Sequence, residues 1–412
     1  MHKIKTVTLG CRFNFYETEV AKSIVEHIEP NDDVVIVNTC AVTHEAERQS
    51  KQAVRKVIRE NPGAKVIVTG CAATTAEKYF DELNGAMIIK NNEKCNPRLY
   101  NILFHKSSDM PLDNAQELQE SDELFVNRVR AFLPIQNGCN HFCTYCIVPY
   151  TRGRSDSVPL DVIIRRVNHL ISIGFKEIVL SGIDITSYKY EGITLAGVIK
   201  GILSKTPIKR LRISSLDPAG IDSELFDMMT NETRIMPHFH LSIQSGDNDV
   251  LKAMRRRHTR EEVLKLCFSI LEQRPDVVFG SDFIAGFPTE TELMFENTLK
   301  LIDEAHLSLM HIFPFSPRTG TAAAQMIQLP RKVIHERAKR LRNKSKQAKT
   351  KLFRSLVGKT LTGMIEKTET GTSYGKIDSF VPFLVNEVIK PQTIVNGIIR
   401  NFDAENLELN II

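Results

Sequence analysis

Short apolar runs alternate with longer segments of helical spacing in the first part of the chain. The apolar runs are Ile4–Leu9, Val34–Val37, Ala64–Val68 and Met87–Lys90. Apolar residues recur at helical spacing across Phe15–Ile28, and a long polar helix is expected across Glu45–Glu60. Because parallel strands need a crossover connection, this alternation predicts a parallel sheet with helices on its faces.

The same alternation continues in a second region. Six further strand candidates follow: Phe132–Gln136, Glu177–Leu180, Leu211–Ser214, His238–Ile243, Val277–Ile284 and His306–Phe313. Helical patterns separate them, as in Leu160–Ile173, Thr259–Gln273 and Glu290–Ala305. Six β-α repeats predict an open, partial (β/α)6 barrel with its site at the carboxyl ends of the strands.

The pattern changes again near the C-terminus. From Arg331 to Arg354 a helical pattern carries 11 Lys or Arg residues against one acid, Glu336. Such an imbalance leaves positive potential that attracts a polyanion, although a charge run can also be only a solvated face. Five short β-rich runs follow: Thr360–Glu366, Ser373–Phe380, Phe383–Val388, Thr393–Arg400 and Leu407–Ile412. Their number and length predict a small OB-like barrel, a fold that commonly binds nucleic acid.

These patterns predict an α/β chain of three domains. We expect an N-terminal parallel-sheet domain over residues 1–110, the partial barrel over 125–345 and the small β-barrel over 346–412. The stretch Lys106–Asp122 is polar, acidic and aperiodic, which predicts a linker, bounded at 111–124. A length of 412 residues suits two or three domains better than one.

Composition narrows the class of protein. The chain is 42% hydrophobic and 25% charged, which is typical of a globular protein with a sizeable core. No apolar run reaches the roughly 18 residues of a membrane span, and the first residues, MHKIKTVTLG, contain no apolar signal segment. Eight Cys without a secretion signal predict a cytoplasmic protein whose thiols are metal ligands or catalytic. The net charge of +5 permits a polyanionic partner without requiring one.

The strongest candidate for chemistry is a cysteine loop directly after the first strand of the partial barrel. Cys139, Cys143 and Cys146 are spaced C-x3-C-x2-C, and no Cys follows until Cys267. Three thiolates this close can bind three irons of a four-iron cluster and leave the fourth iron open to a ligand. The alternatives are a zinc site, which usually has two more widely separated ligand pairs, or three buried thiols.

Three other cysteines occupy equivalent places in the N-terminal region. Cys11, Cys40 and Cys71 each come just past the carboxyl end of a predicted strand, where open α/β sheets build their binding sites. They should converge in space and could hold a second cluster with one open iron. The alternative is that each is a small buried apolar residue. We expect Cys95 to be structural and Cys267, inside an amphipathic helix, to lie in the core.

Polar residues also stand where the strands of the partial barrel end. The candidates are Gly182, Asp184, Ser215, Gln244 and Asp282. Residues of these types also serve as caps and turns between strand and helix, so this alternative stays open for each. A basic loop, Arg255–Arg257, is expected at the same face, although such clusters are most often solvated surface. The pair Arg152 and Arg154 after the cysteine loop is a candidate for contact with phosphate.

The cysteine loop resembles a known family. C-x3-C-x2-C with an aromatic residue, Tyr145, before the last Cys resembles radical S-adenosylmethionine (SAM) enzymes, and the longer string GCNHFCTYCIVPYTRGR resembles their methylthiotransferase branch. The strings TLGCRFNFYETE, NTCAVTHEAE and VTGCAA resemble the N-terminal domain of methylthiotransferases. The terminal β-rich region resembles the TRAM domain, which implies tRNA binding.

The resemblance assigns roles to these residues. It implies a [4Fe-4S] cluster on Cys139, Cys143 and Cys146 that cleaves SAM to a radical. It implies an auxiliary [4Fe-4S] cluster on Cys11, Cys40 and Cys71 that presents sulfur. The implied SAM pocket contains Tyr145, Gly182, Asp184, Ser215, Gln244, Arg257 and Asp282. The cofactors carry the radical chemistry, and the protein positions and shields them.

The first motif indicates the substrate. TLGCRFNFYETE is most similar to the branch that modifies tRNA N6-threonylcarbamoyladenosine, with Asn14, Tyr16 and Glu17 kept and Arg12, Phe13 and Phe15 departing from its usual form. The implied reaction converts C2–H of this base, at position 37 of tRNAs that decode ANN codons, to C2–S–CH3. The implied partners are the tRNA anticodon stem-loop and an electron donor such as a flavodoxin or ferredoxin, with no membrane.

Because of these departures, two enzymatic alternatives stay open: methylthiolation of isopentenyladenosine, or of an aspartate in a ribosomal protein. A third alternative is of another class, an RNA-binding iron–sulfur redox sensor. A sensor with structural clusters would normally have a fourth protein ligand at each cluster.

Overall fold

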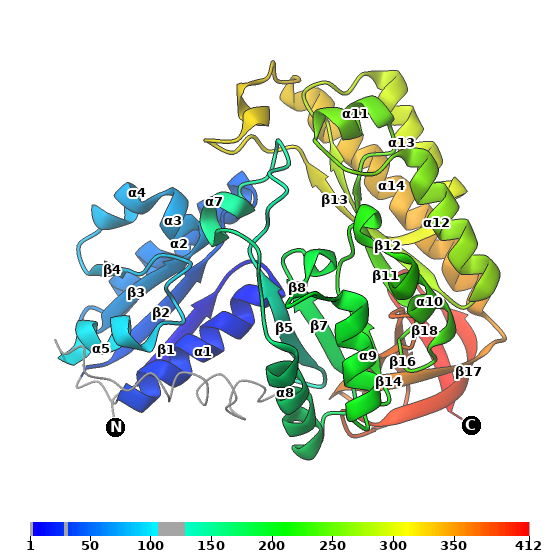
Figure 1. Cartoon of the computed structure of the whole chain (residues 1–412), viewed down its shortest axis with the longest axis horizontal. Coiled ribbons are helices and arrows are strands. Elements are labelled where there is room, and N and C mark those ends of the chain that lie inside the picture. The colour runs from blue at the N-terminus through cyan, green and yellow to red at the C-terminus, as the bar shows by residue number, and fades with distance from the viewer. Residues whose placement is uncertain (1–2, 29–31, 106–127, 412) are drawn as a thin grey trace. The chain divides into compact units, whose positions relative to one another are not determined.

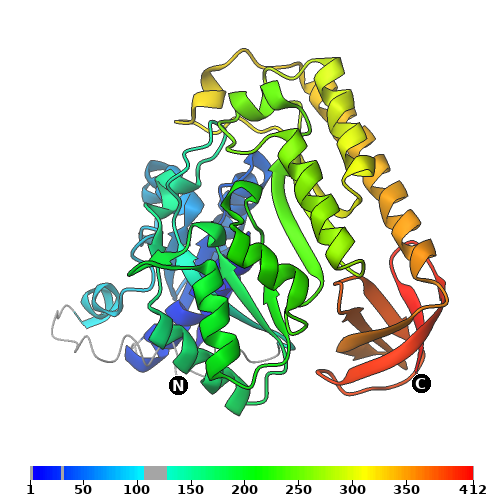
Figure 2. The same cartoon turned by 45° about the vertical axis from the view of Figure 1, so that its right-hand side comes forward.

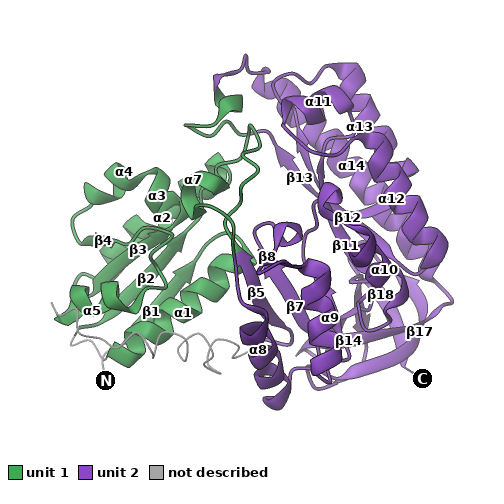
Figure 3. Cartoon of the chain, viewed as in Figure 1, with its two compact units in different colours: residues 1–127, 137–156, 316–324 green, residues 128–136, 157–315, 325–412 purple. Residues whose placement is uncertain are grey.

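The computed structural model describes residues 3–28, 32–105 and 128–411. The predicted linker, Lys106–Asp122 or 111–124, lies outside these residues. The chain forms two compact units, coloured separately in Figure 3. Unit 1 comprises 1–127, 137–156 and 316–324, and unit 2 comprises 128–136, 157–315 and 325–412. The three domains predicted from the sequence are continuous segments, whereas these two units are built from separate segments, so the domain limits stay a prediction.

Unit 1 is built on a parallel sheet with the strand order β1-β2-β3-β4. The strands are β1 (Ile4–Thr8), β2 (Val34–Thr39), β3 (Lys65–Gly70) and β4 (Ala86–Ile88). The helices are α1 (Arg12–Ile28), α2 (His44–Glu60), α3 (Cys71–Thr75), α4 (Glu77–Asp81), α5 (Pro97–His105) and α7 (Val148–Arg152) (Figure 1). All residues of β2 are buried, as expected of a central parallel strand that is covered on both faces. The predicted alternation of strands and helices is confirmed.

Unit 2 contains a partial barrel of six parallel strands. They are β5 (Ala131–Asn137), β7 (Ile178–Gly182), β10 (Leu211–Ile213), β11 (His238–Gln244), β12 (Val278–Ala285) and β13 (Leu307–Pro314). Bridges from Leu211 to Ile235 and from Leu216 to Leu241 join the β10-β7-β5-β6 sheet to the β11-β12-β13 sheet. The six predicted strands are therefore confirmed. The sequence pattern missed β6 (Asp156–Ser157) and the hairpin of β8 (Lys189–Tyr190) and β9 (Ile193–Thr194).

Helices alternate with the barrel strands, and several begin with a capping side chain. They are α8 (Leu160–Ser172), α9 (Leu195–Lys205), α10 (Ser223–Asn231), α11 (Asn248–Ala253), α12 (Arg260–Gln273) and α13 (Glu292–Glu304). Thr259 and Glu262 form a reciprocal capping box at the start of α12. The helix predicted from Thr259 is thus confirmed, with Thr259 as its cap.

The C-terminal strands close into a small barrel in the order β14-β15-β16-β18-β17. They are β14 (Thr360–Glu369), β15 (Thr372–Ile377), β16 (Pro382–Val385), β17 (Ile394–Phe402) and β18 (Leu407–Ile411). The long helix α14 (Arg331–Leu356) leads into this barrel (Figure 2). Phe353 and Leu356 of α14 pack into the barrel core with residues such as Phe383. The predicted five-stranded barrel is confirmed. Among the described helices, none is long and apolar enough to cross a membrane.

Candidate functional site

Three cysteines of unit 1 lie at the carboxyl ends of neighbouring strands. Cys40 directly follows β2, Cys71 begins α3 directly after β3, and Cys11 stands shortly after β1. Cys40 and Cys71 are 5% and 4% exposed, whereas Cys11 is exposed. Because β1, β2 and β3 are adjacent and parallel, the three thiols come to one edge of the sheet.

The thiols share one electrostatic environment. The pKa of the Cys40 thiol is raised, mainly because the thiol is buried and also because the Cys71 and Cys11 thiols lie near it. A hydrogen bond from the Val42 backbone opposes this shift. Gly10 has φ +97°, and a Cβ at this position would lie 2.8 Å from Cys40 Sγ. A side chain at Gly10 would therefore be strained and would collide with the thiol group, so the turn needs glycine.

A buried carboxylate of α1 ties this edge of the sheet to the second cysteine loop. Glu17 is 5% exposed and accepts two hydrogen bonds from Arg152, at 3.0 Å to Oε1 and 2.9 Å to Oε2. Lys94 Nζ lies 2.5 Å from the same Oε2. Burial favours a lower pKa for Arg152, but Glu17 and then the Cys71 thiol raise it more, so the guanidinium stays charged. Arg152, expected to meet phosphate, is instead 5% exposed and paired, and that prediction is wrong.

Two asparagines complete this connection. Asn14 donates from Nδ2 to the carbonyls of Leu9 and Thr39, at 2.9 and 3.2 Å, and accepts from Arg152 at 2.6 Å. Asn91 donates from Nδ2 to the Thr151 carbonyl at 3.0 Å, and the same nitrogen lies 3.8 Å from Cys71 Sγ. The loop that contains Cys139, Cys143 and Cys146 is thus anchored in unit 1 beside the other cysteine group.

The C-x3-C-x2-C loop is folded by its own backbone. The Cys139 N–H donates to the Gly153 carbonyl at 3.2 Å, and the Cys146 N–H donates to the Cys143 carbonyl at 2.9 Å. Phe142 has φ +47°, an uncommon conformation for a bulky residue, and its ring makes an edge contact with Tyr150. Cys143 is 9% exposed, whereas Cys139 and Cys146 are half-buried, as is Tyr145.

The remaining two cysteines are placed as expected. Cys267 is fully buried in α12, and burial raises its pKa to about 12, which confirms the core prediction. Burial also raises the pKa of Cys95 to about 12, and its Sγ lies 4.0 Å from the Glu17 carbonyl. Neither thiol has the lowered pKa of a reactive cysteine.

In unit 2, a glutamine that the sequence pattern did not single out organises the end of the second barrel strand. Gln136 Oε1 accepts from the backbone N–H groups of Ile183 and Asp184, at 3.0 and 2.8 Å. A Cβ on Gly182 would lie 2.9 Å from that oxygen, so a larger residue here would displace the Gln136 side chain. Asp184 accepts from Thr186 and Ser187 at 2.9 and 2.5 Å, which is a turn-capping role.

The other candidates at the strand ends differ in their surroundings. Gln244 ends β11 at φ +77°, next to a register shift against β12. Such a conformation in a residue other than glycine is strained and is often found at functional sites. Ser215 is exposed just after β10. Arg257 pairs with Asp217 at 3.0 Å and is 43% exposed. The cofactor contacts expected of these residues stay predictions.

Asp282 of β12 is the candidate with the most unusual partners. One carboxylate oxygen, Oδ1, lies 3.0 Å from His240 Nε2 on β11 and 3.0 Å from His311 Nδ1 on β13. Burial favours a higher pKa for Asp282, but the hydrogen bonds and charges of the two histidines lower it well below its usual range. Neither histidine stood out in the sequence, although each is a polar residue inside an apolar strand.

Comparisons with known proteins agree with this architecture. Residues 133–302 match the radical SAM superfamily, and residues 3–89 match a family described as uncharacterized protein family UPF0004. A solved structure of the radical SAM methyltransferase TsrM from Kitasatospora setae superposes with a TM-score of 0.57 over 77% of this chain and 75% of that one. Its sequence identity is 12%, so this likeness shows the fold alone.

Two relatives give the family. The threonylcarbamoyladenosine tRNA methylthiotransferase MtaB of Rickettsia prowazekii is 43% identical over 93% of this chain and 91% of its own length. The tRNA-2-methylthio-N(6)-dimethylallyladenosine synthase of Ehrlichia canis is 32% identical over 90% of this chain and 88% of its own length. The chain belongs to the methylthiotransferase family of radical SAM enzymes.

Family membership implies a [4Fe-4S] cluster and SAM. The donor set of the C-x3-C-x2-C loop fits this cluster, because three thiols leave one iron for SAM, whereas a structural zinc site normally takes four protein ligands. When bound, the cluster and SAM supply a carbon radical. The chain contributes three thiols on a loop that Arg152 and Asn91 hold in place.

Proposed function

We propose that the chain converts N6-threonylcarbamoyladenosine of tRNA to its 2-methylthio derivative. The observation that carries the proposal is that one compact unit holds both groups of three thiols, joined by Glu17, Arg152 and Asn91. Cys139, Cys143 and Cys146 would hold the SAM-cleaving cluster, and Cys11, Cys40 and Cys71 a second cluster that presents sulfur. The substrate follows the first motif and the higher identity of the Rickettsia relative.

The SAM pocket is proposed at the carboxyl ends of the barrel strands. Gly182, held against Gln136, provides a close backbone approach, and the strained Gln244 provides an amide there. Tyr145, Asp184, Ser215, Arg257 and Asp282 complete the proposed set. Asp184 and Arg257 have intramolecular partners that a bound cofactor would have to share or replace.

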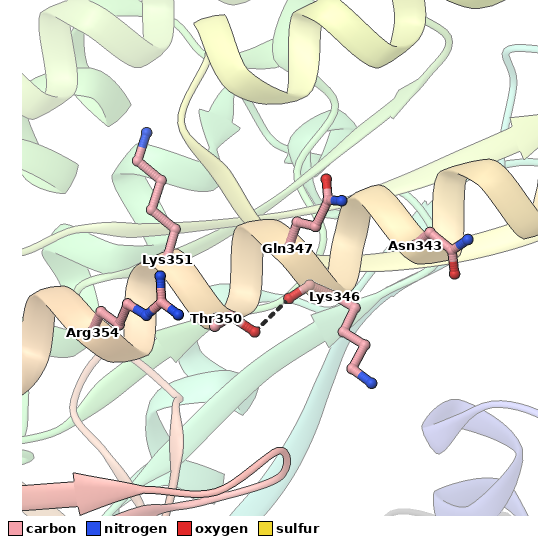
Figure 4. Close-up of a pocket in the computed structure, with 6 residues that line it drawn as sticks. All are labelled: Asn343, Lys346, Gln347, Thr350, Lys351 and Arg354. Carbon is pink, nitrogen blue, oxygen red and sulfur yellow. Dashed lines mark hydrogen bonds between the residues drawn. The ribbon is translucent and has the colours of Figure 1, made fainter.

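The tRNA would meet unit 2 through α14 and the small barrel. Part of the positive charge of α14 is neutralised, because Arg337 pairs with Glu290 and Arg340 pairs with Glu292 and Glu296. Farther along the helix, a surface pocket of about 550 Å³ is lined by Asn343, Lys346, Gln347, Thr350, Lys351 and Arg354 (Figure 4). Three cations interleaved with amides and a hydroxyl suit a phosphate backbone.

The decisive experiment is mass spectrometry of tRNA nucleosides from a strain that lacks this chain. Loss of 2-methylthio-N6-threonylcarbamoyladenosine, restored by the wild-type chain, is the expected result. Loss of the 2-methylthio form of isopentenyladenosine instead would move the protein to the other tRNA branch. Unchanged tRNA nucleosides would favour a ribosomal-protein aspartate or an RNA-binding redox sensor.

Two further features belong to the proposal. We place the reaction in the cytoplasm, where thiols stay reduced, with electrons supplied by a flavodoxin or a ferredoxin. The domain limits are proposed as 1–110, 125–345 and 346–412, so that the cysteine loop belongs to the barrel by sequence although it packs in unit 1.

A further inference from the structure

Unit 2 contains a group of metal-ligating side chains that includes no cysteine. His240 on β11, Asp282 on β12 and His311 on β13 offer three ligand atoms that all lie within 4.8 Å of one another. In the strand register, His240 is opposite Gly280 and Asp282 is opposite His311. Because side chains alternate along a strand, the three residues share one face of the sheet.

We propose that these three residues form a binding site for a divalent transition-metal ion. Both imidazoles direct a nitrogen at the same oxygen, Asp282 Oδ1, each at 3.0 Å. Ligand atoms that lie about 2.0 to 2.2 Å from one ion, at octahedral or tetrahedral angles, are themselves about 3 to 3.5 Å apart. The two nitrogen–oxygen distances match this spacing. All three ligand atoms lie within 4.8 Å of one another, so small side-chain rotations would bring them to one ion.

The orientation of His240 is fixed by the neighbouring strand. A Cβ on Gly280 would lie 2.7 Å from His240 Nδ1, so glycine at this position allows the ring to lie against β12. In this orientation the other ring nitrogen, Nε2, faces Asp282 Oδ1 at 3.0 Å. The His240 side chain is 12% exposed, so it forms the rigid inner part of the site. The two imidazole rings lie 5.0 Å apart between centroids.

The donor set indicates which ion the site would take. Two imidazoles and one carboxylate favour zinc, iron, cobalt or nickel over magnesium or calcium, which prefer oxygen ligands. His311 is 68% exposed and Asp282 23% exposed, so the site opens on one side and leaves coordination positions for an oxygen ligand. Asp282 also belongs to the proposed SAM set, so the ion and the cofactor would compete for this carboxylate, whereas the metal site does not depend on the proposed substrate.

The test uses the full chain with its cysteine sites loaded anaerobically with iron, then incubated with zinc and desalted. The expected result is one zinc per chain by elemental analysis at unchanged iron, with only nitrogen and oxygen ligands in the zinc X-ray absorption spectrum. His240→Gln and His311→Gln should each lower zinc affinity by about tenfold or more. His311 is mostly exposed, so its variant is expected to fold.

His335→Gln is the matched control. His335 is an exposed histidine of α14, and its loss should leave the bound zinc unchanged. Absence of zinc, retention of zinc by both His240→Gln and His311→Gln, or sulfur ligands in the spectrum would each overturn the proposal. Sulfur ligands in particular would mean that zinc had replaced iron at the cysteines.

Discussion

Each compact unit buries a glutamate among cations, but the two networks differ in charge. In unit 1, Glu17 faces two cations, Arg152 and Lys94. In unit 2, Glu177 faces Arg130, Arg210 and Arg212, and two of these guanidinium groups are shared with further carboxylates, Glu366 and Asp378. The first network thus has one carboxylate for two cations, whereas the second has three carboxylates for three cations.

This difference follows what each network adjoins. The surplus cation of unit 1 stands beside thiols, since Arg152 is influenced by Cys71 and Cys11. Thiolates and their clusters are anionic, so a buried positive charge there stabilises the charged form. The balanced network of unit 2 joins β7 and β10 of the partial barrel to β14 and the turn after β15. Its carboxylates and cations balance, so the network has a structural role and needs no further charged ligand.

The largest expected effect separates the two cysteine groups of unit 1. Replacing Cys139, Cys143 and Cys146 by Ala should remove about half of roughly eight irons, since each cluster holds four. Cleavage of SAM to 5′-deoxyadenosine should fall to background. Replacing Cys11, Cys40 and Cys71 should also halve the iron but leave SAM cleavage, while the methylthiolated product is lost. Iron assay and product analysis measure these outcomes.

The matched control is Cys267→Ala, which changes a buried thiol of unit 2. Its iron content should equal that of the wild-type chain. Full iron retention in the Cys139, Cys143 and Cys146 variant would refute the cluster assignment. Equal loss of SAM cleavage in both triple variants would mean that the two groups do not have separate roles.

The next effect tests the unbalanced network. Glu17→Gln leaves Arg152 and Lys94 buried without a carboxylate, and removing one partner of a buried ion pair costs about 3–5 kcal/mol. Urea unfolding of the full chain should show this loss. Glu26→Gln, on the same helix, removes a half-buried partner of Lys22 at 3.2 Å and should change stability by less than about 1 kcal/mol. If the two variants are equally stable, Glu17 does not hold the loop.

In the balanced network, Glu177 should contribute about 3 kcal/mol to the free energy of unfolding near neutral pH, and this contribution should be lost in acid. Burial favours a higher pKa for Glu177, but Arg212, Arg130 and Arg210 lower it to about 2 from an ordinary value of 4.5. A lowered pKa stabilises the fold above pH 4.5, and this contribution is lost as the pH falls toward 2. The urea-unfolding difference between wild type and Glu177→Gln should therefore shrink over this range. Acid loss of clusters affects both proteins alike, and a constant difference would contradict the assignment.

Features that depend on neighbouring residues could be predicted from the sequence. Apolar runs predicted the six barrel strands because buried parallel strands are continuously apolar, and the C-x3-C-x2-C spacing marked its loop directly. Strands β6, β8 and β9 were missed because two residues show no periodicity. Cys11, Cys40 and Cys71 could be grouped only because each follows a predicted strand.

The long-range pairs had no such signal. Arg152 and Glu17 are 135 residues apart, and the local sequence around Arg152 suggested only an exposed basic loop. Lys94 was not singled out at all, because a buried lysine is exceptional and only its carboxylate partner explains it. The same holds for His240, Asp282 and His311, since their meeting depends on strand order and register.

The smallest effect concerns cations that unit 2 leaves on its surface. Lys346, Lys351 and Arg354 of α14 are exposed and have no ion-pair partner among the described residues. Replacing all three by Gln should weaken tRNA binding moderately and lower the slope of log affinity against log salt by about 2 to 3, because each phosphate contact releases counterions. The control changes three exposed lysines of unit 2, Lys176, Lys205 and Lys209, to Gln, which alters net charge equally. An equal fall in both variants would mean that net charge alone attracts the tRNA, whereas a fall confined to the α14 variant would locate the phosphate contacts on this helix.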